Sequence, residues 1–225
     1  MFHVIENILT ENDLQTIYAE VGALEFEDGK RTAGRAARKV KNVLQAKGFN
    51  QTLAMKLMQN KLRRNEQFRL CAAPLRLSTI MLSKYEVGME YGHHTDNAIM
   101  ESGAIRADLA FTVFLSDPGT YDGGELEVSL CDHADESPAL EYKLSAGSAL
   151  VYPAIFRHRV KPVRSGQRLV AVGWAQSMIR DHHKREIIRE LSIARDALFS
   201  VDGKSIAFDG MGNALSNLVR MWAEN

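Results

Sequence analysis

The chain is short of cysteine, of proline and of long apolar runs. Its 225 residues include two Cys and five Pro, and Cys71 and Cys131 have no Cys-x-x-Cys spacing. This excludes a disulfide framework and a zinc ribbon, and it favours a reducing compartment. No stretch approaches the roughly 18 apolar residues of a membrane helix, and residues 1–6 lack the basic start and apolar run of a signal peptide. We therefore expect a cytoplasmic protein with no membrane partner.

Net charge is also absent, but the charges are unevenly distributed. The 28 Lys and Arg balance the 28 Asp and Glu, which argues against nucleic acid as a partner. Residues 1–29 carry seven acids and no Lys or Arg, whereas residues 30–65 carry eleven bases and no acid. One interpretation is a pair of solvated faces that partly neutralise each other. The other is a docking surface, formed by residues 30–65, for an acidic partner.

Apolar spacing predicts helices at the start of the chain. Thr10 can cap a helix in which apolar residues recur at helical spacing from Leu14 to Leu24. The segments 36–45 and 51–64 have the same period. We therefore expect residues 1–72 to form an N-terminal helical region that packs on the rest of the protein.

The period changes in the middle of the chain. Between Leu75 and Ser177, several runs alternate apolar and polar residues with period two, separated by turn signals. This pattern predicts about eight strands with no intervening helix, which is typical of an antiparallel barrel or jelly roll. After Met178 the helical period returns. The predicted fold class is therefore mainly β with flanking helices: a β core over 73–178 and a C-terminal helical extension over 179–225.

The spacing His-x-Asp occurs twice, at His94 and Asp96 and at His133 and Asp135. In an extended chain this spacing points both side chains to one face, where they can bind the same metal ion. The second pair lies in the polar, turn-rich segment 131–138, which would not hold ligands rigidly. The first pair ends an aromatic, strand-like segment. We therefore prefer His94 and Asp96 as ligands.

A third ligand is predicted on a later strand. The turn around residues 164–166 predicts a hairpin that places His158 opposite Val172, so that His158, Arg168 and Trp174 share one buried face. We expect Trp174 to fill the core there. A buried arginine needs an anion. Its partner is either a core carboxylate, Glu125 or Glu127, or a bound ligand.

Two His and one Asp around open coordination positions are typical of non-haem Fe(II) oxygenases. A nearby anion-binding arginine favours 2-oxoglutarate, whose 2-oxo acid end would bind iron while Arg168 binds its far carboxylate; O2 would take the last position. A zinc-dependent hydrolase is the alternative enzyme, because the same ligands suit zinc. It lacks a convincing general base and leaves Arg168 unexplained. A non-enzymatic metal or 2-oxoglutarate sensor, docking through residues 30–65, is a third reading.

Longer motifs strengthen the oxygenase interpretation, and they resemble the bacterial PKHD-type hydroxylases, also called the PiuC iron-uptake-factor family. The resemblance runs nearly end to end. The motifs that carry it are Tyr91-Gly92-His93-His94-Thr95-Asp96-Asn97-Ala98, Arg106-Ala107-Asp108-Leu109, Phe114-Leu115-Ser116-Asp117-Pro118, Tyr121-Asp122-Gly123-Gly124-Glu125-Leu126, Tyr152-Pro153, His158-Arg159-Val160 and Trp174-Ala175-Gln176-Ser177.

The resemblance implies a double-stranded β-helix (jelly-roll) core related to prolyl 4-hydroxylases, and dependence on Fe(II), 2-oxoglutarate and L-ascorbate. By motif match, His94, Asp96 and His158 would bind the iron and Arg168 the 2-oxoglutarate. Tyr85 resembles a tyrosine that contacts 2-oxoglutarate in the prolyl hydroxylases.

The expected reaction couples oxidative decarboxylation of 2-oxoglutarate to C–H hydroxylation of an unidentified substrate, a small molecule or a protein side chain. A link to iron homeostasis follows from the family name. One departure from the family pattern is His93, where we expect an aromatic residue. The terminal helices are a candidate homodimer face.

Overall fold

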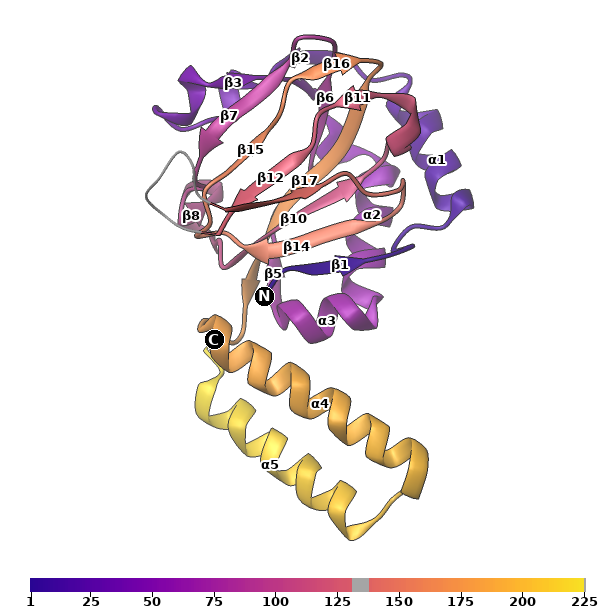
Figure 1. The fold of residues 1–225 in the computed structure, drawn as a ribbon, viewed down its shortest axis with the longest axis vertical. Helices are drawn as coiled ribbons and strands as arrows, with labels where there is room; N and C mark the ends of the chain where they lie inside the picture. Colours follow the sequence, from indigo (N-terminus) through magenta and orange to yellow (C-terminus); the bar gives the residue numbers. More distant parts are fainter. Residues whose placement is uncertain (131–137, 225) are drawn as a thin grey trace.

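The computed structural model describes residues 1–130 and 138–224. Figure 1 shows two β-sheets facing each other, with helices against one of them and a helical hairpin that projects from the body. The larger sheet has eight strands, and all of its described strand pairs are antiparallel. Most of the paired strands are distant in sequence. In order across the sheet they are β1 (His3–Ile5), β14 (Ala149–Pro153), β10 (Leu109–Phe114), β17 (Arg168–Ser177), β6 (Met81–Tyr85), β4 (Leu44–Ala46) and β2 (Phe26–Asp28), with β5 (Pro74–Leu77) paired to β17.

The smaller sheet has five strands. They are β13 (Ala139–Tyr142), β12 (Leu126–Ser129), β15 (His158–Val160), β7 (Glu90–His94) and β3 (Lys41–Asn42). Two short ribbons add β11 (Asp122–Gly123) to β16 (Val163–Ser165) and β8 (Ile99–Met100) to β9 (Ile105–Arg106). The sheets and helices together confirm the predicted fold class, a mainly β jelly roll with flanking helices.

The alternation in β10 and β17 explains why the larger sheet has apolar residues on both faces. Phe111 and Val113 of β10 pack with the helices on the outer side. Phe114 of the same strand packs with Val128 of β12 between the two sheets. Successive side chains of a strand point to opposite faces, so one strand contributes to two cores. The functional face is the inner one.

Three helices cover the outer face of the larger sheet: α1 (Glu11–Val21), α2 (Leu53–Arg64) and α3 (Glu66–Ala72). Thr10 is the N-cap of α1, as predicted, and forms a capping box with Asp13. The buried Asp13 also pairs with Lys61 of α2 at 2.6 Å. Because each helix buries only one face, this pairing and the shared core hold them on the sheet.

The predicted helix over 36–45 is wrong. The chain there has one 3-10 turn, Ala37–Lys39, and then β3 and β4. β3 pairs with β7 in the smaller sheet, and β4 pairs with β6 in the larger one. Pairing with distant strands overrides the local helical period, which is a weak preference. The segment closes one side of the barrel between the two sheets.

The predicted hairpin that folds His158 onto Val172 is also wrong. β15 lies in the smaller sheet between β12 and β7, whereas β17 lies in the larger one. The turn before β17 instead follows β16, and β16 pairs with β11. The local signal correctly marks a turn, but it does not specify which sheet each arm joins. His158 and Arg168 nevertheless both line the cavity between the sheets.

The chain ends in two long helices, α4 (His182–Asp202) and α5 (Ile206–Trp222), that form the projecting hairpin. Arg185 is buried at its base and donates to the carbonyls of Ile179 and Arg180 at 2.7 and 2.8 Å. No helix among the described residues is long and apolar enough to cross a membrane. The division into regions 1–72, 73–178 and 179–225 stays a prediction.

Candidate active site

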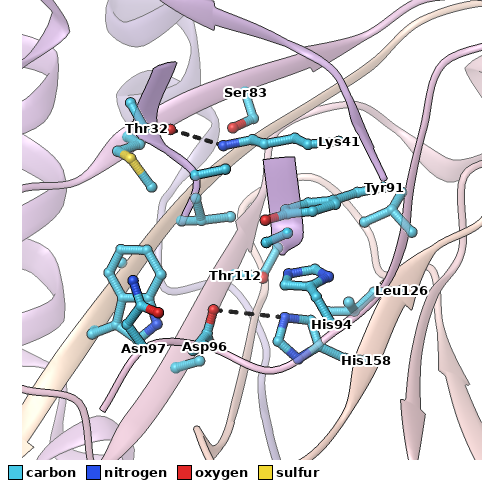
Figure 2. A pocket seen from close by; sticks show the side chains of 18 of the residues that line it. Thr32, Lys41, Ser83, Tyr91, His94, Asp96, Asn97, Thr112, Leu126 and His158 are labelled. Atoms are coloured by element: carbon cyan, nitrogen blue, oxygen red, sulfur yellow. Dashed lines mark hydrogen bonds and ion pairs between the residues drawn. The ribbon is translucent and has the colours of Figure 1, made fainter. Parts of the chain in front are cut away.

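A cavity lies between the two sheets, and Figure 2 shows it from close by. Its wall combines aromatic and polar side chains from both sheets and from the segment before β3. The lining residues include Thr32, Gly34, Lys41, Gln45, Ser83, Tyr85, Tyr91, His94, Asp96, His158, Arg168 and Trp174. All five residues predicted for the site, Tyr85, His94, Asp96, His158 and Arg168, are among them.

The two histidines and Asp96 converge at one end of this cavity. His94 is the last residue of β7 and His158 the first of β15, and these two residues are direct partners in the ladder. Asp96 follows β7 at period two, so its carboxylate points to the same side. One ligand atom from each of the three lies within 4.8 Å of the others, and His158 Nε2 is 3.9 Å from Asp96 Oδ1. The three side chains form a cluster that can hold one metal ion.

Backbone contacts set which nitrogen of each imidazole faces the cluster. His94 Nδ1 lies 2.8 Å from the carbonyl of Gly92, and His158 Nδ1 lies 3.0 Å from that of Phe156. A carbonyl can only accept, so each Nδ1 carries a proton, and in the neutral imidazole the lone pair is then on Nε2. Burial, reinforced by His158, lowers the pKa of His94 to about 3. Its imidazole is therefore neutral at pH 7, as a metal ligand requires.

Arg168 lies in the same cavity without a partner for its charge. Its side chain is 1% exposed, and its Nε and Nη1 have no hydrogen-bond partner in the described chain. No carboxylate of residues 1–130 or 138–224 forms an ion pair with it; Glu127, one predicted partner, instead binds Arg159 at 2.8 Å. An unpaired buried cation is costly. Of the two alternatives for its partner, a core carboxylate is therefore not found among the described residues, and the guanidinium suits an anionic ligand.

Aromatic rings enclose this arginine. Its guanidinium lies 5.0 Å from the ring centroid of Tyr85, its partner residue across β17 and β6, and 5.6 Å from that of Phe114. Burial raises the pKa of Tyr85, partly offset by Arg168. The phenol therefore stays protonated and keeps an O–H donor beside the guanidinium.

The other histidines of the described chain lie outside the cluster. His93 points to the opposite side of β7, and its Nε2 lies 3.8 Å from Glu127. Strand alternation accordingly separates His93 from His94. The alternative His-x-Asp pair, His133 and Asp135, lies outside the described residues.

The sequence interpretation missed three features of the wall. Lys41 is buried there, and burial lowers its pKa to about 8. Tyr91 stacks on His94 with ring centroids 3.6 Å apart. Trp174, expected only in the core, also lines the cavity, and its Nε1 is buried without a partner in the described chain. The basic run and the Tyr-x-x-His spacing are sequence signals that could have pointed to Lys41 and Tyr91. Because residues 36–45 were predicted as a helix, Lys41 was not expected in the cavity wall.

Comparison with known proteins agrees with this geometry. The profile of the 2OG-Fe(II) oxygenase superfamily matches residues 80–176. The chain is 42% identical to a PKHD-type hydroxylase of Gloeothece citriformis and 44% identical to one of Synechococcus elongatus, with 100% of each chain covered in both matches. A prolyl hydroxylase from Trichoplax adhaerens, solved with a hypoxia inducible factor peptide fragment, has a similar fold: TM-score 0.55, 15% identity, covering 80% of this chain and 84% of that one.

The jelly roll and the cavity with its His-Asp-His cluster are those of a 2OG-Fe(II) oxygenase, an enzyme that uses Fe(II), 2-oxoglutarate and O2. Within that superfamily, the chain belongs to the PKHD-type hydroxylases. The predicted family, enzyme class and cofactors are thereby confirmed. The zinc-hydrolase and non-enzymatic sensor interpretations are not supported by this membership.

Proposed function

We propose that His94, Asp96 and His158 bind the Fe(II), that Arg168 binds the far carboxylate of 2-oxoglutarate, and that Tyr85 contacts the same carboxylate. The observation that carries the proposal is a buried guanidinium with unpartnered nitrogens in the same cavity as the cluster. The donor set fits Fe(II), since two imidazoles and one carboxylate leave positions open for other ligands.

When bound, the iron and 2-oxoglutarate would supply the oxidising chemistry: decarboxylation to succinate and CO2, coupled to hydroxylation of a substrate C–H bond. The protein residues would orient the iron and the cosubstrate and shield them from water. The contacts to the Gly92 and Phe156 carbonyls hold both imidazoles in one tautomer. Arg168 fixes one end of the cosubstrate by a charge-assisted bond that is strong because water is excluded.

An anaerobic titration tests these roles. We expect Asp96→Ala to lose Fe(II) affinity at least tenfold, because one of three ligands is gone. Arg168→Met should keep Fe(II) and lose 2-oxoglutarate affinity at least tenfold. Asp202→Ala and Arg63→Met change exposed residues and serve as matched controls. Normal 2-oxoglutarate binding by Arg168→Met would contradict the assignment, and so would full Fe(II) binding by Asp96→Ala.

Four further parts of the proposal concern the setting of the enzyme. L-ascorbate would restore iron oxidised in uncoupled turnovers, and the physiological role would lie in iron homeostasis, in keeping with the family resemblance. The protein would act in the cytoplasm, in keeping with a free, buried Cys71. The exposed apolar residues Phe199, Val201 and Ile206 of the terminal helices would serve a homodimer face. Succinate formation with and without ascorbate tests the first of these.

A further inference from the structure

A second cation lies in the cavity, away from the residues assigned to iron and 2-oxoglutarate. Lys41 of β3 is 5% exposed. Its Nζ donates to Thr32 Oγ1 at 2.8 Å and lies 5.3 Å from the ring centroid of Tyr91. No carboxylate in the described part of the chain lies within ion-pair distance of it. An ammonium group has three donors, so the hydrogen bond to Thr32 leaves donors for a ligand.

The groups that contact Lys41 directly are neutral, and the carboxylates of Asp28 and Asp96 act on it only from beyond ion-pair distance. Thr32 Oγ1 accepts from Lys41 and donates its own proton to Gln45 Oε1 at 2.6 Å. Gln45 Nε2 in turn lies 3.5 Å from Ser83 Oγ. This chain of hydrogen bonds orients the lysine but supplies no negative charge. A buried ammonium with no carboxylate in direct contact is unfavourable without an anion, so the arrangement suits a ligand of one negative charge.

The position of Lys41 relative to the His-Asp-His cluster limits the size of that ligand. The Tyr91 ring stacks on His94, with centroids 3.6 Å apart and an interplanar angle of 14°. Lys41 Nζ lies over the same Tyr91 ring. Figure 2 shows Tyr91 between Lys41 and His94, with the Tyr91 hydroxyl, the Lys41 ammonium and the Asp96 carboxylate on the same side. A small molecule or side chain can therefore reach from Lys41 to the cluster.

The wall beside Lys41 belongs to the basic segment 30–65. Thr32, Ala33, Gly34 and Ala37 line the cavity, and the exposed bases around them include Lys30, Arg31, Arg35 and Lys39. The segment holds no acid. These bases lie around the wall and do not line the cavity itself, and Arg31 is paired with Glu27 at 2.6 Å. An excess of positive charge beside a cleft still raises the local concentration of anions. The charge distribution therefore favours an anionic substrate rather than the protein docking surface that the sequence suggested.

We propose that Lys41, positioned by Thr32, binds a carboxylate of the substrate, so that the enzyme acts on a carboxylate-bearing small molecule or an acidic side chain. This inference rests on the proposed function of the same cavity. It assigns Lys41 to the substrate and Arg168 to 2-oxoglutarate. One ammonium with a neutral hydroxyl beside it matches a single negative charge and not a phosphate dianion.

Anion probes test the assignment on protein loaded with Mn(II) and 2-oxoglutarate under nitrogen. In crystals soaked in bromide, we expect anomalous density within contact distance of Lys41 Nζ. In solution, calorimetric titration should show acetate but not acetamide binding, and Lys41→Met should weaken acetate at least fivefold. Lys41→Arg, which keeps the charge, should retain it. Lys39→Met is the matched control, because Lys39 is exposed on the same segment and does not line the cavity.

Each adverse result has a separate meaning. Wild-type crystals without bromide at Lys41, or acetamide binding as well as acetate, would overturn the inference even if no variant folds. So would 2-oxoglutarate seated on Lys41, or a loss of 2-oxoglutarate affinity in Lys41→Met equal to that in Arg168→Met. In these cases the proposed function would stand. Failure of wild-type protein to bind Fe(II) and 2-oxoglutarate at all would instead count against the proposed function.

Discussion

Single residues in this cavity respond to burial in different ways. His94 loses its charge, because its pKa falls to about 3, whereas Arg168 keeps a charge that nothing in the described chain neutralises. The difference follows from intrinsic basicity, since a guanidinium does not deprotonate in proteins. One residue becomes a neutral metal ligand, and the other an anion receptor.

The neutral His94 predicts a pH dependence of stability for the metal-free protein. Its pKa is lowered from 6.5 to about 3 in the folded state, so between these values the unfolded chain binds a proton that the native protein does not. Unfolding free energy should therefore be fully retained above pH 6.5 and fall as the pH drops toward 3. Urea denaturation of wild type and His94→Gln at several pH values checks this. An equally steep fall in the variant would contradict it.

A substitution at Gly124 is expected to change both stability and 2-oxoglutarate binding. Its φ is +67°, and a Cβ there would lie 3.0 Å from Arg168 Cδ. Gly124→Ala should therefore both strain the backbone, by about 1 kcal/mol, and displace the guanidinium, so that 2-oxoglutarate binds several-fold more weakly by calorimetry. Gly48→Ala is the matched control, because φ is +72° there and nothing lies within 4 Å. Equal 2-oxoglutarate affinities in the two variants would show that Gly124 does not help to position Arg168.

At the scale of elements, the consecutive strands β3 and β4 show how a crossing between two sheets can form part of a site. Val43 lies between them and is buried, and the chain passes there from the smaller sheet to the larger one. That crossing places Lys41 and Gln45 in the same cavity wall. A helix over the same residues would not pair with β7 and β6, so the cavity would be open on that side.

The capping box of α1 predicts a stability effect with no effect on the site. Thr10 accepts from the Asp13 amide at 3.3 Å and donates to its carboxylate at 2.7 Å. Thr10→Ala should lower the unfolding free energy by about 1 kcal/mol, the usual value of an N-cap. Thr16→Ala, an exposed position in the same helix, should change it by less than about 0.5 kcal/mol. Urea denaturation measures both, and equal effects would mean that the cap contributes nothing.

At the scale of the whole molecule, the α4–α5 hairpin is joined to the oxygenase core at the start of α4 and at the end of the chain. The hairpin projects from the body in Figure 1. Besides Arg185, Glu186 of α4 lies 2.7 Å from His3 of β1, and Glu224 ties the end of the hairpin back to the core through Arg106 at 3.0 Å. No residue of α4 or α5 in the described chain lines the cavity. Changes at the base of the hairpin should therefore affect stability and leave ligand binding intact.

Arg185→Met tests this separation. Loss of its two bonds leaves the Ile179 and Arg180 carbonyls without a charged donor, which should cost about 1.5–3 kcal/mol of unfolding free energy. Fe(II) and 2-oxoglutarate affinities should match wild type. Arg220→Met, exposed near the end of α5, is the control and should change neither quantity. Weaker 2-oxoglutarate binding in folded Arg185→Met would show that the hairpin does influence the cavity.

The sequence by itself determined the β core, the flanking helices and the identity of the candidate ligands. Period-two alternation and His-x-Asp spacing are local properties, and strand geometry converts them directly into shared faces. Arg168 could be singled out because its strand neighbours are apolar and a buried cation needs an anion. The pair His94 and Asp96 required no knowledge of which strands pair, whereas His158 was linked to Arg168 through a predicted hairpin that the structure does not contain.

Only the tertiary structure decided what depends on pairing between distant segments. It placed β15 beside β7 rather than on β17, and it turned the expected helix over 36–45 into strands of two sheets. Strand partners lie far apart in sequence, so their long-range contacts outweigh local preference. Lys41 entered the cavity wall by that route, because a residue's chemical surroundings are set by the segments packed around it and not by its neighbours in the chain.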